Sequence, residues 1–144
     1  MRIRFQPLIA ALAGLAATGL SIAGPEVVLV ASKRSPVGQM AVAEARNLFL
    51  GLPVGVGGQA LKPVRNTADG VVTEAFMQRV MFMSAEDYER QIRTRVTRSG
   101  GSRPAAYGDL TEVTTVLQRD PLAVTYMERS QAKHSPGLKI IGEP

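Results

Sequence analysis

Residues 26–31 read EVVLVA, a nearly continuous apolar run that is rich in β-branched side chains. A strand with one face in water alternates apolar and polar residues, whereas a continuous run is typical of a strand that is buried on both faces, as in a parallel sheet. Such a strand is stable only where other elements cover both of its faces. The run therefore limits the chain to folds in which helices pack on both sides of a sheet.

Further along the chain, strand patterns alternate with helix patterns. Apolar residues at helical spacing predict helices over residues 39–50, 69–82, from Ser84 onward, and 109–119, and short apolar runs predict strands at 61–65, 122–127 and 138–141. Gly, Pro and Ser mark residues 53–60 and 99–108 as loops, which we expect to be mobile. The alternation predicts an α/β fold of three layers, with a mostly parallel sheet and helices on both faces.

The N-terminal residues have the pattern of a secretory signal peptide. Arg2 and Arg4 precede an apolar stretch that runs from Leu8 to Ala23, and small residues occupy the positions before a cleavage point after Ala23. An uncleaved membrane anchor is the alternative, although sixteen residues are short for a span that needs about 20. We therefore expect residues 1–23 to be removed and residues 24–144 to form one periplasmic domain without a membrane span.

The composition narrows the function. The chain carries a net charge of +5, which falls to +3 without Arg2 and Arg4, so an exported protein of this kind is a poor nucleic-acid binder. It has no Cys and a single histidine, His134, in a turn-like segment. One His without Cys cannot supply the usual zinc ligands, and no nucleophile–base pair or phosphate-binding glycine loop is present. We expect no cofactor, no metal and no enzymatic activity.

Residues 64–76, VRNTADGVVTEAF, have the order strand, polar turn, helix start. Free N–H groups and the helix dipole make such a turn suited to an anion. Asp69 is a suitable N-cap residue for this helix. Val72, Phe76 and Val80 form a buried stripe at helical spacing.

Several short motifs occur in an order that resembles a known family. They are FLG at 49–51 closing a helix, LKPVR at 61–65, the polar turn, and PLAVTY at 121–126. Together they resemble the phosphate ABC-transporter substrate-binding proteins of the type 2 periplasmic binding protein class. The resemblance covers nearly all of residues 26–141 and concerns mainly the second of that family's two lobes, so it implies a short, single-lobe form.

The resemblance implies a site for phosphate or a related oxyanion at the turn. The family pattern resembles R-x-D-G-S-G-T, and counting back from Phe76 places its last three positions on Gly70, Val71 and Val72, without hydroxyl groups. Hydrogen bonds to charged groups contribute about 1.5–3 kcal/mol each, so two missing donors weaken binding by roughly two to four decades. The candidate ligand-binding residues are Arg65, Asp69, Gly70, Val71, Val72 and Thr73, with Ser32 and Ser35 expected on the same side at the carboxyl ends of parallel strands.

A second hypothesis is an envelope interaction module that kept the fold and lost the ligand. It would dock onto a transport or sensor partner, or form a homodimer, through the face that the other lobe covers in the family. The basic cluster of Arg90, Arg93, Arg95, Arg98 and Arg103 is another candidate docking surface, although such a cluster is also typical of the solvated face of a helix.

Overall fold

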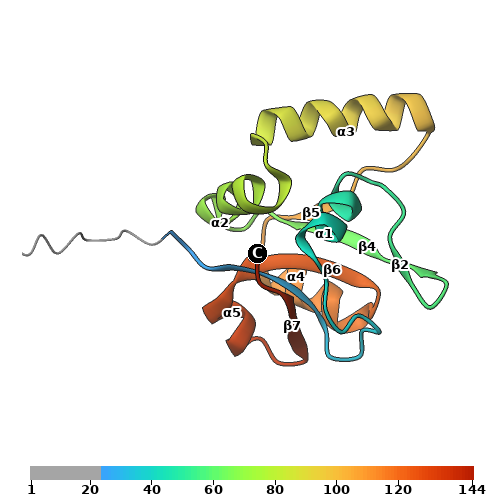
Figure 1. The fold of residues 1–144 in the computed structure, drawn as a ribbon. Helices are drawn as coiled ribbons and strands as arrows, with labels where there is room; N and C mark the ends of the chain where they lie inside the picture. The colour runs from blue at the N-terminus through green and yellow to red at the C-terminus, as the bar shows by residue number, and fades with distance from the viewer. Residues whose placement is uncertain (1–23) are drawn as a thin grey trace, which may run out of the picture.

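The computed structural model describes residues 24–144, so the predicted signal peptide lies outside the described residues. A five-stranded sheet forms the centre, with the strand order β5-β4-β6-β1-β7. Helices lie on both of its faces, as Figure 1 shows. The strands are β1 (Val27–Ser32), β4 (Lys62–Asn66), β5 (Ala105–Tyr107), β6 (Ala123–Glu128) and β7 (Leu138–Gly142). The predicted α/β fold with layered helices is confirmed.

One face of the sheet carries α1 (Val42–Phe49), α2 (Gly70–Phe76), the π-helix η1 (Met77–Met81) and α3 (Ala85–Ser99). The other face carries α4 (Leu110–Arg119) and α5 (Arg129–His134). Side chains of the central strands alternate between these layers. Leu29 and Tyr126 belong to the first core, whereas Val28, Val30 and Met127 belong to the second. All six residues of β1 are buried, as the apolar run predicts.

The direction of β1 differs from the expectation. β4 is parallel to β5 and β6, but β1 is antiparallel to both of its neighbours, β6 and β7. Four of the five strands therefore share one direction and β1 opposes them. A continuous apolar run specifies burial on both faces but not the direction of the neighbouring strands, so the parallel assignment of this strand was wrong. As a consequence, the loop after β1 lies at the opposite end of the sheet from the end of β4.

Three short elements occur where loops or turns were expected. The edge strand β5 lies inside the loop 99–108, and β2 (Gly55–Val56) pairs with β3 (Gln59–Ala60) as a hairpin inside the loop 53–60. α5 ends at His134, which is exposed but helical, so the turn-like assignment of that segment was wrong. Each of these elements has three to six residues, or only two in the hairpin strands, too few for periodicity to show. Among residues 24–144, no helix is both long and apolar enough to span a membrane.

Three aromatic side chains fix α1 and α2 to the sheet. The Phe76 ring stacks on Tyr126 of β6, with 3.8 Å between centroids, and meets the edge of Phe49 at 4.9 Å. All three side chains are fully buried. Val72 and Val80 join the same core, which confirms the predicted helical stripe. These contacts set where α2 begins relative to the end of β4.

We predict that Phe76→Ala lowers the free energy of unfolding by about 3–5 kcal/mol, because it removes a buried ring and leaves a cavity beside Tyr126. Val71→Ala in the same helix is the matched control. Val71 is 63% exposed, so its truncation should change stability by less than about 0.5 kcal/mol. Urea denaturation of both variants provides the measurement. Similar losses for the two variants would show that the aromatic stack does not hold α2 in place.

Candidate functional site

The β4–α2 turn lies at the carboxyl ends of the parallel strands β4, β5 and β6. The side chain of Asn66 forms hydrogen bonds with the neighbouring strand β6 and within the turn. Its Nδ2 donates to the carbonyl of Tyr126 at 3.0 Å, and its Oδ1 accepts from the N–H of Ala68 at 3.2 Å. The N–H of Thr67 donates to the carbonyl of Tyr107 at 2.9 Å. The turn is therefore tied to both neighbouring strands, and the start of α2 has a fixed position.

Asp69 caps α2 in the way that its residue type predicts. Its Oδ1 accepts from the N–H of Val71 at 2.9 Å and from the N–H of Val72 at 3.4 Å. These are two of the amides that the sequence assigned to an oxyanion. The carboxylate of the chain itself therefore lies where an external anion would bind, stabilised by the helix N-terminus. The side chain of Asp69 does not bind the N–H of Gly70.

Thr73 and Gly70 lie beside a groove at the start of α2. The groove has a volume of about 410 Å³ and reaches the start of α3 at Ser84 and Ala85. The hydroxyl of Thr73, however, donates to the carbonyls of Asn66 and Asp69, each at 3.0 Å. Its hydrogen is therefore directed to carbonyls at the end of β4 and at the N-cap of α2.

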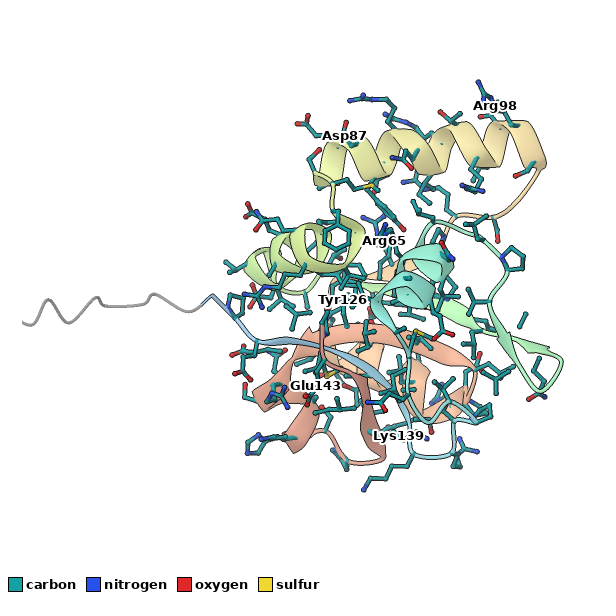
Figure 2. The ribbon with its side chains drawn as sticks, in the orientation of Figure 1. Arg65, Asp87, Arg98, Tyr126, Lys139 and Glu143 are labelled. Carbon is teal, nitrogen blue, oxygen red and sulfur yellow. The ribbon has the colours of Figure 1, made fainter. Side chains whose placement is uncertain are left out.

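Arg65 is engaged by two residues of α3. Its Nη1 lies 2.7 Å from Oε1 of Glu89, and its guanidinium lies 5.0 Å from the centroid of the Tyr88 ring. Figure 2 shows Arg65 between the sheet and α3. The same carboxylate of Glu89 also pairs with Arg103. Arg65 therefore joins β4 to α3, and it shares the single negative charge of Glu89 with Arg103.

The environment of this ion pair is partly buried. The side chain of Arg65 is 13% exposed and that of Glu89 is 30% exposed. Burial tends to raise the pKa of the Glu89 carboxyl, but the hydrogen bonds and positive charges of Arg65 and Arg103 outweigh it and hold the pKa below its ordinary value. Burial raises the pKa of the Tyr88 hydroxyl, which donates to the carbonyl of Phe49 at 2.7 Å.

Two buried polar atoms near Thr73 have no hydrogen-bond partner within the described part of the chain. They are Nε of Arg65 and the hydroxyl of Tyr126. Burial is the main cause that raises the pKa of the Tyr126 hydroxyl, whose neighbours are Thr73, Arg65 and the backbone of Asn66. Unsatisfied polar atoms are uncommon in protein interiors. The Tyr126 ring lies against Phe76 of α2, and the Arg65 guanidinium lies near the Tyr88 ring of α3.

Ser32 and Ser35 lie far from this region. Because β1 opposes the other strands, Ser32 pairs with Leu138 at the beginning of β7, not with the carboxyl ends of β4 and β6. Both serines are buried, and their hydroxyl oxygens accept from the N–H groups of Arg34 and Val37, respectively. They cap local turns at the other end of the sheet. Their assignment to the same site as Arg65 and Thr73 was wrong.

The structure thus brings Asp69, Gly70, Val71, Val72 and Thr73 together at one helix start and gives Arg65 another partner. Sequence reasoning did not identify that partner, since Glu89 lies 24 residues from Arg65 on a different element. No described residues form a group of three or more His, Cys, Asp or Glu side chains that could hold a metal ion.

The β4–α2 turn lies at the carboxyl ends of the parallel strands, which is the edge where open α/β sheets generally bind ligands. Structural comparisons find the same fold in known proteins. The chain is similar to an ABC-type phosphate transport receptor from Vibrio cholerae, with a TM-score of 0.58, 13% identity, and coverage of 81% of this chain and 45% of that one. It is similar to PstS from Borrelia burgdorferi, with a TM-score of 0.58, 15% identity, and coverage of 82% and 47%.

A further neighbour is a possible phosphate-binding protein from Planctomyces limnophilus DSM 3776, with a TM-score of 0.54, 13% identity, and coverage of 83% of this chain and 45% of that one. The chain therefore spans less than half the length of these structures, which is consistent with a single-lobe form, and at this identity the similarity shows the fold. No family model matches the chain, and no curated protein matches it.

We predict that Glu89→Gln lowers the free energy of unfolding by about 1.5–3 kcal/mol at neutral pH, because Arg65 loses a charged hydrogen-bond partner. The loss should shrink with acidification. The pKa of Glu89 lies below 4.5 in the folded state, so its stabilisation is complete above the unfolded value and disappears as the pH falls through the folded value. Urea denaturation at neutral pH and below pH 4.5 tests both statements.

Asp87→Asn is the matched control on the same helix. Asp87 pairs with Arg90 at 3.1 Å, but both side chains are at least half exposed. An exposed pair of this kind contributes about 0–1 kcal/mol. Equal losses of unfolding free energy for Glu89→Gln and Asp87→Asn would mean that the Arg65–Glu89 pair stabilises the fold no more than an exposed ion pair does.

Proposed function

We propose that the protein is an exported solute-binding-like protein that binds phosphate or a related oxyanion weakly at the β4–α2 turn. The observation that carries the proposal is the capping contact of Asp69, in which an anionic oxygen lies 2.9 Å from the N–H of Val71. The amides at this turn are thus suited to a carboxylate or phosphate oxygen. The fold similarity to phosphate receptors supports the same class of ligand. Export to the periplasm rests on the sequence of residues 1–23.

Three features weaken the proposed site. An incoming anion must displace the carboxylate of Asp69, whose capping contributes about 0.5–2 kcal/mol, equivalent to about 2- to 30-fold in affinity. The positions of Val71 and Val72 lack hydroxyl donors, a loss of roughly two to four decades. Arg65 is engaged by Glu89. The missing hydroxyls are the largest of these effects, so weak binding is expected even after Asp69 is removed.

The docking alternative has less support. Within residues 24–144, the exposed large hydrophobic side chains are Leu52, Val71 and Phe82. They belong to a loop, to α2 and to the residue after η1, respectively. No single helix or strand presents them together as an apolar face that a partner or a second copy would cover.

We predict that Asp69→Gly strengthens phosphate binding by about 2- to 30-fold, and by more where the loss of like charge adds to the freed amides. Glycine at the N-cap costs only a few tenths of a kcal/mol, so α2 should remain folded. Isothermal titration calorimetry with phosphate, against a chloride blank at equal ionic strength, provides the measurement.

Asp109→Gly is the matched control. Asp109 caps α4 in the same way, with 2.7 Å between its Oδ1 and the N–H of Thr111, and carries the same charge. Because Asp109 follows β5 at the same edge of the sheet, its loss acts on phosphate through charge alone and should raise the affinity by less than Asp69→Gly does. No phosphate heat in either the wild type or Asp69→Gly would refute the oxyanion site and favour the docking alternative, and equal gains in both variants would indicate a general charge effect.

A further inference from the structure

α3 carries arginines that the candidate site does not use. We call Arg90, Arg95 and Arg98 the arginine face, because they line one shallow recess of about 420 Å³ together with Gln91, Thr94 and Ser99. Arg90 and Arg98 are exposed, whereas Arg95 is half-buried and its side chain lies close to Gly51. Within residues 24–144, Arg90 is the member that forms an ion pair, at 3.1 Å from Asp87, and that pair is exposed. The positive charges of the face are therefore largely uncompensated.

Helix electrostatics explain only part of this arrangement. Cations are favoured in the last turn of a helix, where α3 places Arg98, and anions in its first turn, where it places Glu86 and Asp87. Arg90 and Arg93 lie in the middle of α3, outside the range of that effect. No acidic residue occurs between Glu89 and Asp109. The second half of α3 therefore has no acidic side chain beside Arg95 and Arg98 on the helix itself.

α3 is anchored by its inner side and leaves most of the arginine face in solvent. Ile92 is 3% exposed and packs in the core, and the hydroxyl of Tyr88 binds the carbonyl of Phe49 at 2.7 Å. Figure 1 shows α3 at the top of the molecule, beyond α1 and α2. In Figure 2 the side chain of Arg98 points away from the domain. The face is thus held on an anchored helix, with Arg90 and Arg98 exposed to solvent.

We propose that the arginine face binds the phosphate-rich headgroups of an anionic membrane surface. All three cations are arginines, whose planar guanidinium groups bind phosphate oxygens in pairs. No exposed large hydrophobic side chain among the described residues lies on α3. The face therefore lacks the aromatic or aliphatic anchors that dominate protein–protein interfaces. A positively charged surface without an apolar anchor residue suits a continuous anionic surface better than a shaped protein pocket.

The experiment is sedimentation of the full chain with vesicles of phosphatidylglycerol and phosphatidylcholine, compared with vesicles of phosphatidylcholine alone. Arg2, Arg4 and the apolar residues 8–23 are common to every variant, so the change in anionic preference between variants reports the contact of the arginine face. Each basic residue near an anionic surface contributes about 1 kcal/mol. The double variant Arg90→Gln with Arg98→Gln should therefore lose about 30-fold of the anionic preference. Raising the ionic strength from about 0.05 M to about 0.5 M should remove the preference of the wild type.

The matched control is Lys33→Gln with Lys133→Gln, which removes the same net charge. Both lysines are exposed, and they line a separate cavity near α5. This control should keep the full preference for anionic vesicles. Equal losses in the two double variants would overturn the proposal, because net charge alone would then explain the binding. Equal binding of the wild type to neutral and anionic vesicles, or binding only to an acidic polypeptide such as polyglutamate, would overturn it as well.

Discussion

The stack of Phe76 on Tyr126 is the contact on which the position of the candidate site depends. Tyr126 belongs to β6, which lies between β4 and β1 in the sheet. The carbonyl of Tyr126 also accepts a hydrogen bond from the side-chain amide of Asn66. The stack therefore fixes α2 against the same residue that fixes the end of β4. Side chains on a close-packed surface of this kind cannot shift independently. The β4–α2 turn is thus held from its strand and from its helix by a single buried tyrosine.

The sequence predicts the layers and the helices well because their signals are periodic. Val72, Phe76 and Val80 recur at helical spacing and all three are in the core. Asp69 caps α2 because its short side chain suits an N-cap in any context. Burial of β1 also follows from its composition. These features depend on residue type and local spacing, which a single sequence contains.

The remaining features depend on pairing between distant segments. The direction of β1 is set by its hydrogen bonds to β6 and β7, and an apolar run does not specify the direction of the strand. This one choice separates Ser32 and Ser35 from the turn. The partner of Arg65 is equally non-local, because any of several acidic residues could have met it. The short edge strand β5 also depends on tertiary contacts, because its exposed residues Ala105 and Ala106 have little strand preference of their own.

The helix start at Asp69 is already satisfied without an external ligand. Its carboxylate takes two amide N–H groups, and Thr73 returns its hydroxyl hydrogen to the carbonyls of the same turn. A helix with unpaired N–H groups at its start is stabilised when an anion binds there, because the anion binds only the folded state. In α2 the carboxylate of Asp69 already makes these hydrogen bonds, so it provides the stabilisation without a ligand. The fold of α2 is therefore independent of ligand, and selection for packing at Val72 and Phe76 can preserve the helix whether or not an oxyanion binds.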